Sequence, residues 1–362
     1  MRRTLPIVLA VLAGLAGWLA YALYTPYQGF AKEGVFVEVP RGATTRSIAR
    51  LLEQNGVIRS RWTFELLARW RSRQPLQAGE YHFDRPRNVL EVFRWVAEGH
   101  VYFRTLTIPE GFNMFQIAAL LEEEGFLTRE EFLSAARTPE AIRDLAPNAN
   151  TLEGYLFPAS YQLPRHPAAK EVVAAMVSRF REAWASLPES DRVGRNVEQV
   201  VTLASLVEKE TGQSNERALV SAVFTNRLKR GIALQCDPTV IYALGLAGRY
   251  NGNLLLRDLR FDSPYNTYRY PGLPPGPIAN PGERSLRAAL APAPVEYLYF
   301  VASGDGGHLF SRTLREHNRS VALFRQKQAE ERTAADPPPP SAPKPQAVSP
   351  PATKKAAVKK TR

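Results

Sequence analysis

The chain opens with an apolar stretch that runs from Leu5 to Leu23 without a charged residue, directly after Arg2 and Arg3. About 19 apolar residues are close to the length that a helix needs to cross a bilayer. Aromatic side chains gather at the far end of the stretch, where their rings favour the membrane interface. These features predict a transmembrane helix over residues 5–24, with residues 1–4 in the cytoplasm and the rest of the chain exported.

A cleaved signal peptide is the alternative interpretation of the same segment, because Ala20-Tyr21-Ala22 fits a small-x-small cleavage site. A retained anchor accounts better for the aromatic residues, which are Trp18, Tyr21, Tyr24 and Tyr27. Both interpretations export the remainder. We expect a single-pass protein of the cytoplasmic (inner) membrane whose body lies on the periplasmic side.

Residues 35–100 show the short alternating and helical patterns of a small α+β unit. Val35–Val39 predicts a strand, and the segment after it predicts a helix with Thr45 as its N-cap. The further expected elements are a helix over Arg61–Arg71, a strand over Gly79–Phe83 and a helix that stops at Gly99. No residue of this unit indicates catalysis, so packing and adhesion are its expected roles.

Residues 101–328 are expected to form a mixed α/β catalytic domain. A strand is predicted over Tyr102–Ile108, and an amphipathic helix follows it with Ile117 and Leu121 on its apolar face. From Thr151 onward the chain holds its densest set of unusual polar residues among glycines and prolines. The predicted fold class of the whole chain is α+β.

The last segment, residues 331–362, is rich in proline and lysine and is expected to be disordered, since it cannot bury enough apolar area to fold. Half of the formal net charge of +12 lies in its part from Pro337 to the end. Because no recognised nucleic-acid-binding motif accompanies the remaining charge, we expect no nucleic-acid partner.

The sequence lacks the motifs of several common catalytic and structural chemistries. The single cysteine, Cys236, excludes an internal disulfide framework. The histidines are too dispersed for a metal-ligand pattern, and we find no P-loop, dinucleotide fingerprint or nucleophile elbow. We therefore expect neither a metal nor a cofactor.

The segment EQVVTLASLVEKETG, residues 198–212, is the most informative for chemistry and fits a helix. At about 100° per residue, Glu210 falls about 20° from Leu203 on the apolar face, while Glu208 and Lys209 point away. A carboxyl group on such a face is desolvated, which raises its pKa and favours the protonated form that a general acid needs. The alternative is a buried structural glutamate that pairs with an arginine or caps a backbone, and the residues alone do not decide between the two.

Two further segments hold candidate residues. Glu153 and Tyr155 lie in TLEGYLFPASYQLP, where aromatic rings near a carboxylate suit sugar stacking, although an aromatic stripe is more often core. A polar turn at Gln235–Asp237 precedes a predicted helix. Asp237 as the N-cap and Pro238 as the first helical residue would explain that pair structurally.

The segment 263–282 is too rich in proline and glycine for regular structure and predicts a rigid, shaped loop. Its Asn266, Tyr268 and Asn280 are suited to hydrogen bonding with sugar hydroxyls.

Four segments in the same order resemble the endolytic murein transglycosylases, the MltG or YceG-like family. They are LASLVEKETG, VFTNRLKRGIALQCDPTVIYALG, YNTYRYPGLPPGPIANPG and YLYFVASGDGGHLFSRTLREHN. The resemblance covers essentially residues 1–328, and within it the unit 35–100 is similar to a degenerate LysM-like module. It implies that the second glutamate of EKE, Glu210, is catalytic, the same residue that the helical spacing selects.

The resemblance implies cleavage of the β-1,4 bond between N-acetylmuramic acid and N-acetylglucosamine in nascent peptidoglycan strands, beside penicillin-binding protein synthases. The muramyl 6-hydroxyl would attack its own anomeric carbon and leave a 1,6-anhydro end, which terminates the strand. One carboxyl group then suffices as acid and base. Candidates for lining the glycan groove are Glu153, Tyr155, Gln235, Asp237, Asn266, Tyr268 and Asn280.

Two alternatives remain open at this level. A glycan hydrolase would use a second carboxylate, Glu153 or Asp237, to activate water. A non-catalytic peptidoglycan-binding scaffold for wall synthases would need no acid at Glu210.

Overall fold

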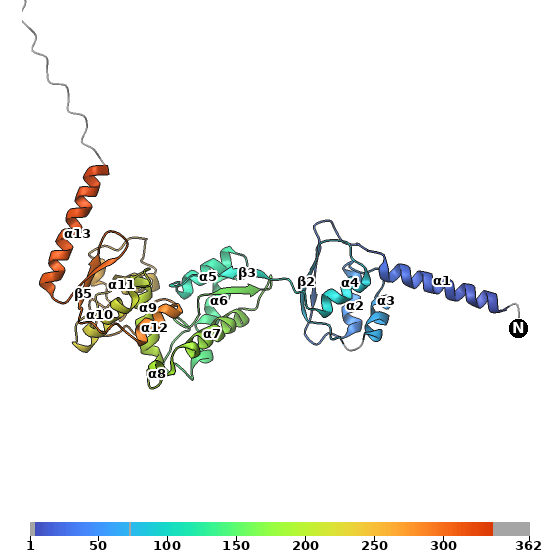
Figure 1. Ribbon diagram of the computed structural model, residues 1–362, viewed down its shortest axis with the longest axis horizontal. Helices are drawn as coiled ribbons and strands as arrows, with labels where there is room; N and C mark the ends of the chain where they lie inside the picture. The colour runs from blue at the N-terminus through green and yellow to red at the C-terminus, as the bar shows by residue number, and fades with distance from the viewer. Residues whose placement is uncertain (1–3, 72–73, 336–362) are drawn as a thin grey trace, which may run out of the picture.

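The computed structural model describes residues 4–71 and 74–335, apart from the side chains of residues 4–6, 8, 329 and 331–335. Within this part of the chain the strands form three separate two-stranded antiparallel sheets, and helices make up most of the rest (Figure 1). The class is α+β, as the sequence predicts. A mixed α/β arrangement was expected in the second half, but every strand pairing described there is antiparallel.

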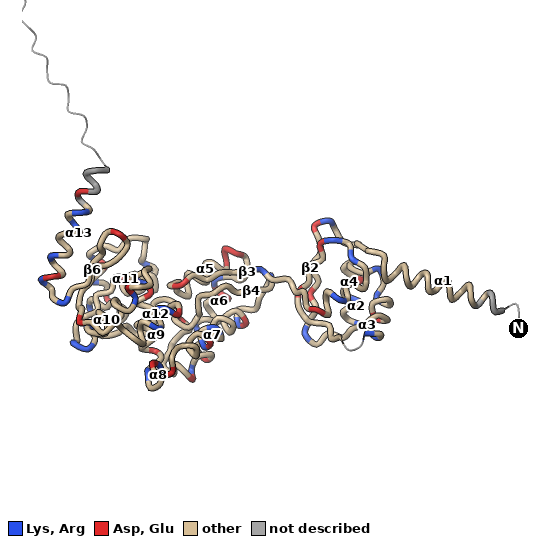
Figure 2. Tube along the Cα trace, in the orientation of Figure 1, with Lys and Arg blue, Asp and Glu red and all other residues tan. Residues whose placement is uncertain are grey.

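The N-terminal apolar stretch forms helix α1 (Thr4–Tyr24), which projects from the body of the protein and carries no charged residue along its described length (Figure 2). Within the described residues, no helix meets the length and apolarity needed to cross a membrane. The expected span starts at residue 5, and the side chains of residues 5, 6 and 8 lie outside the described set. The membrane anchor therefore stays a prediction.

The first folded unit follows α1 and has its own core. Strand β1 (Val35–Val39) pairs with β2 (Gly79–Phe83), as predicted. The core joins both strands to the helices α2 (Thr45–Gln54), α3 (Arg61–Trp70) and α4 (Val89–Ala97). One detail of the prediction was wrong: the N-cap of α2 is Thr44, whose extended backbone lets its hydroxyl accept from the Ser47 amide at 3.2 Å.

The second part begins with the ladder β3 (Arg104–Thr107) and β4 (Ser160–Leu163). Between and after these strands the chain forms α5 (Met114–Glu123), α6 (Arg129–Ala136), the 3₁₀ turn η1 (Pro139–Ile142), α7 (Ala169–Ser186) and the short α8 (Glu189–Arg192). As predicted, Ile117 and Leu121 of α5 are fully buried. Capping boxes at Asn113 and Thr128 fix the starts of α5 and α6.

The third part is built around helix α9 (Val197–Glu210), against which α10 (Arg217–Lys229), α11 (Asp237–Leu246) and α12 (Glu283–Leu290) pack. Every residue from Val200 to Val207 is buried. Val201 and Ala204 belong to the core shared with α5–α7, whereas Leu206 and Val207 belong to a second core with α10 and α11. Helix α9 therefore joins the two cores.

The chain closes with the ladder β5 (Tyr299–Ala302) and β6 (His308–Ser311) and a long helix, α13 (Leu314–Ala335). The 3₁₀ turn η2 (Asp258–Arg260) and the predicted irregular loop lie between α11 and α12. Because α13 continues to Ala335, the first five residues of the expected tail are helical. The remainder of that tail lies outside the described residues.

Gly154 offers a test of how closely the loop 263–282 fits the core. Its φ is +90°, and an added Cβ would lie 2.5 Å from Pro277 Cγ and 2.8 Å from Val201 Cγ1. Gly125 also has a positive φ, +70°, but open space around it. We expect Gly125→Ala to cost about 1 kcal/mol and Gly154→Ala about 2–4 kcal/mol of unfolding free energy, measured by denaturant titration. Equal losses would contradict the tight fit.

Candidate functional site

Glu210 is the last residue of α9, at the wall of a cleft of about 270 Å³. The helix ends there because Thr211 is extended, with φ −138° and ψ 133°. Glu210 is half-buried, with its exposed part toward the cleft. The other residues that line the cleft are Arg227, Leu234, Gln235, Asp237, Tyr268, Phe300 and His317.

Burial raises the pKa of the Glu210 carboxyl, and the nearby charge of Asp237 raises it further. A hydrogen bond from the Cys236 thiol and the positive charges of His308 and Arg227 oppose this rise in pKa. Cys236 itself is fully buried, which holds the pKa of its thiol well above the usual value and keeps it a donor. The protonated form of Glu210 is therefore favoured, as the sequence predicts for a general acid.

The turn before α11 brings three predicted residues to the cleft. Gln235 has φ +52°, the one positive value of a non-glycine residue in the described chain. This backbone turns the chain so that Cys236, not Asp237, is the N-cap of α11, which corrects the prediction by one residue. Asp237 then accepts a hydrogen bond from the Tyr268 hydroxyl at 2.6 Å. Gln235, Asp237 and Tyr268 thus share the cleft with Glu210.

Arg227 and His317 also line the cleft, although the sequence did not single them out. The Arg227 guanidinium is buried and donates to the carbonyls of Leu298 at 2.6 Å and Leu234 at 2.8 Å. Burial lowers the pKa of His317, whose ring stacks on Tyr299 at 5.3 Å. One signal was available in the sequence: Arg227 lies in the last turn of a helix that precedes the polar turn.

Glu208 points away from the cleft, as predicted, and it is buried there. Its side chain is 5% exposed and forms an ion pair of 3.0 Å with Arg217 of α10, which is 6% exposed. It also accepts from the Gly282 amide at 3.0 Å. Because the side chain meets α10 and the start of α12, Glu208 joins three elements and lies on a different face of α9 from the cleft.

The structure does not bring Glu153, Tyr155 and Asn280 to the cleft. The Glu153 carboxyl is fully buried and accepts from the Met114 amide at 3.0 Å, Tyr242 hydroxyl at 3.1 Å and Asn280 amide at 2.9 Å. Asn280 in turn accepts from the backbone of Gly154 at 2.8 Å. These groups tie the loop 263–282 to α5, and Tyr155 packs edge-on against Phe180 in the core.

Asn266 is fully buried as well, and its side chain holds the conformation of the loop backbone. Its side-chain amide donates to the carbonyls of Leu259 at 3.0 Å and Phe261 at 2.7 Å. Its side-chain oxygen accepts from the Tyr268 amide at 3.0 Å. Asn266 therefore positions Tyr268, which does line the cleft.

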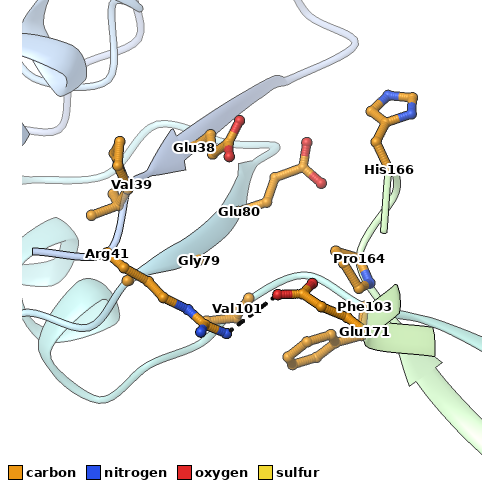
Figure 3. A pocket seen from close by; sticks show the side chains of 12 residues that line it. Glu38, Val39, Arg41, Gly79, Glu80, Val101, Phe103, Pro164, His166 and Glu171 are labelled. Carbon is orange, nitrogen blue, oxygen red and sulfur yellow. Dashed lines mark ion pairs between the residues drawn. The ribbon is translucent and has the colours of Figure 1, made fainter. Parts of the chain in front are cut away.

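A larger pocket of about 450 Å³ lies between the first unit and the second part, lined by residues such as Glu38, Glu80 and His166 (Figure 3). The ion pair that crosses it, Arg41–Glu171 at 3.8 Å, joins side chains that are 91% and 63% exposed. The two charged groups of this ion pair are therefore solvated, unlike the carboxyl of Glu210. Among the described residues, no cluster of three or more His, Cys, Asp or Glu side chains is placed to hold a metal ion.

Comparison with known proteins identifies the family of this chain. The model of the YceG-like family matches residues 37–323, which include most of the first unit and the whole cleft. The chain belongs to the YceG-like family. The match includes every residue that lines the cleft around Glu210.

Individual relatives agree with the YceG-like assignment. The chain is 34% identical over 322 residues to the endolytic murein transglycosylase of Bacillus subtilis (strain 168), covering 84% of this chain and 88% of the relative. It is 29% identical to the endolytic murein transglycosylase of Streptococcus pneumoniae (strain D39), where it covers 87% of this chain and 64% of the relative. A yceG-like protein from Listeria monocytogenes, solved as a crystal structure, is 32% identical with a TM-score of 0.54 over 80% of this chain and 99% of its own.

Glu153 gives a pH-dependent prediction. Burial outweighs its hydrogen bonds and raises its pKa to about 7. A carboxyl whose folded pKa is raised stabilises the fold below its unfolded pKa, and this stability is lost as pH rises through the folded pKa. The unfolding free energy of the wild type, relative to Glu153→Gln, should therefore fall by roughly 3 kcal/mol between about pH 4 and about pH 8.

Urea titrations of both proteins across this range measure the difference. Glu210 is present in both, so its own titration cancels. A difference that stays constant with pH would mean that folding does not raise the pKa of Glu153.

Proposed function

We propose that this protein is an endolytic murein transglycosylase that cuts the β-1,4 bond between N-acetylmuramic acid and N-acetylglucosamine. The observation that carries the proposal is the Glu210 carboxyl, desolvated at the wall of an open cleft and favoured in its protonated form. The names of the relatives in Bacillus subtilis and Streptococcus pneumoniae support the same reaction.

The proposed reaction needs one carboxyl group. Protonated Glu210 donates its proton to the glycosidic oxygen as the bond to the muramyl anomeric carbon breaks, which releases the 4-hydroxyl of N-acetylglucosamine. The muramyl 6-oxygen forms the new bond to the same carbon, and the Glu210 carboxylate takes the 6-hydroxyl proton. The acid is thereby regenerated, and no water enters the products.

Other groups of the cleft have supporting roles in this proposal. Asp237 raises the pKa of Glu210, and the Tyr268 hydroxyl fixes Asp237. The exposed polar surfaces of Gln235 and Asp237 are available for hydrogen bonds with sugar hydroxyls. Because Glu153, Asn266 and Asn280 are buried, we assign them to positioning the loop and not to contact with the glycan, and we assign the buried Tyr155 to the core.

We further propose that α1 anchors the chain in the cytoplasmic membrane, with the catalytic part on the periplasmic side. The charge-free apolar run from Leu5 to Leu23 and its helical conformation support this. In this position the enzyme would meet nascent strands as penicillin-binding protein synthases extend them. The unit 35–100 would act as a LysM-like module between the anchor and the cleft.

Two glutamates of one helix give a matched test of Glu210. Glu210→Gln removes the proton donor without breaking an ion pair, so turnover of purified glycan strands should fall at least about 100-fold with little change in melting temperature. Glu208→Gln breaks the buried pair with Arg217 and should cost about 3–5 kcal/mol of stability while the folded enzyme keeps its activity. Calorimetry and a strand-cleavage assay measure both properties. Retained activity in Glu210→Gln would support a non-catalytic scaffold.

The products separate the transglycosylase from a hydrolase. Asp237 is the second carboxylate of the cleft, so a hydrolase would use it to activate water. We expect mass spectrometry of digested strands to find 1,6-anhydromuramyl ends, in both the wild type and Asp237→Asn. Reducing muramyl ends that disappear in Asp237→Asn would establish hydrolysis instead.

A further inference from the structure

Helix α3 of the first unit exposes a stripe of large apolar side chains. Trp62, Leu66 and Trp70 are 64%, 52% and 81% exposed and recur at every fourth residue, which places them along one side of the helix. The other side of α3 carries Phe64 and Leu67, both buried in the core of the unit. Two tryptophans so exposed on one helix face indicate a surface that meets an apolar partner.

Arginines surround this stripe. Arg59 precedes α3, Arg61 begins it and Arg69 lies in its last turn. Among the described side chains, none of the three has a carboxylate within ion-pair distance. The Arg61 guanidinium stacks on Trp62 at 5.0 Å, so charge and aromatic surface are contiguous. Tryptophan and leucine beside unpaired arginines are typical of helices that lie at a phospholipid interface.

The stripe lies on the unit that holds the end of α1. The Arg59 guanidinium stacks on Tyr21 of α1 at 5.0 Å and on Tyr27 at 4.9 Å. Leu23 packs against the core of the first unit, and α1 contacts both α3 and α4. Figure 1 shows α3 beside the base of α1. If α1 spans the membrane, α3 is therefore held close to the headgroups.

We propose that the α3 face of Trp62, Leu66 and Trp70 inserts into the surface of an anionic phospholipid bilayer next to the anchor. This inference rests on the anchoring proposed above for α1. The unpaired arginines match lipid phosphates, which favours a membrane over a second copy of the chain as the occupant. A second contact beside α1 restricts tilting of the first unit and so fixes how it presents the catalytic part to strands at the membrane.

Bromolipid quenching of tryptophan tests this contact in the full chain. Trp18→Phe is introduced throughout, so that α1 contributes no tryptophan, and the protein is reconstituted in vesicles of phosphatidylcholine with or without phosphatidylglycerol. In brominated anionic vesicles we expect quenching of the tryptophan emission. This quenching should disappear when Trp62→Phe and Trp70→Phe are combined. Two tryptophans remain in that variant, the half-buried Trp95 of α4 and Trp184, which is 6% exposed, and their emission supplies the baseline.

Charge reversal tests the arginines. Arg69→Glu should weaken quenching in anionic vesicles, whereas Arg230→Glu, an equal charge change at the exposed end of α10, should leave it unchanged. Thermal melts check that both variants fold. Equal quenching in both lipids, unaffected by Arg69→Glu, would overturn recognition of anionic headgroups.

Flotation separates this proposal from the anchor. Protein that floats with the vesicles but whose Trp62 and Trp70 stay unquenched contradicts the α3 contact alone. Protein that does not float contradicts the anchor and the α3 contact together. A change from oligomer to monomer on removing Trp62 and Trp70, without quenching in the parent, would identify a second copy as the occupant and overturn the membrane proposal.

Discussion

The desolvation of one carboxyl group at the end of α9 is the interaction on which the site depends. Burial of Val200 to Val207 on all sides fixes α9 between two cores, and this fixes the position of its last residue. Glu210 then faces the cleft with the Cys236 thiol as its hydrogen-bond donor. A thiol is a weak donor, and it stabilises a carboxylate less than an amide or an arginine would. The rise in the pKa of Glu210 that burial causes therefore prevails.

Three glutamates of the catalytic part show how surroundings decide the role of one side-chain type. Glu208 pairs with the buried Arg217 and accepts from the Gly282 amide at the start of α12, so it links α9 to both helices. Glu153 receives three donors and is closed off from solvent, so it holds the loop to α5. Of the three, Glu210 is the one whose carboxyl is desolvated, accepts from the weak thiol donor of Cys236 and also faces an open cleft. That combination supports proton transfer to a ligand, whereas the other two arrangements support the fold.

The sequence predicted what depends on local spacing and missed what depends on distant contacts. Strand and helix positions in the first unit, and the placement of Glu210, follow from periodicity within about ten residues. Glu153 and Asn280 are 127 residues apart, and no local pattern shows that they satisfy each other. The one-residue shift of the cap at Cys236 arises from the positive φ of Gln235, which composition does not reveal. Arg227 was missed because its partners are backbone carbonyls.

Arg227 explains why the cleft can hold a positive charge beside an acid that stays protonated. Its donors are directed to the carbonyls of Ala233, Leu234 and Leu298, so the guanidinium is already satisfied and forms no ion pair with Glu210. The charge of Arg227 lowers the pKa of Glu210 less than burial raises it. In the proposed reaction, once Glu210 has given up its proton, the same charge favours the carboxylate that then accepts the 6-hydroxyl proton. The fixed position of Arg227 thus supports both the acid and the base form of one residue.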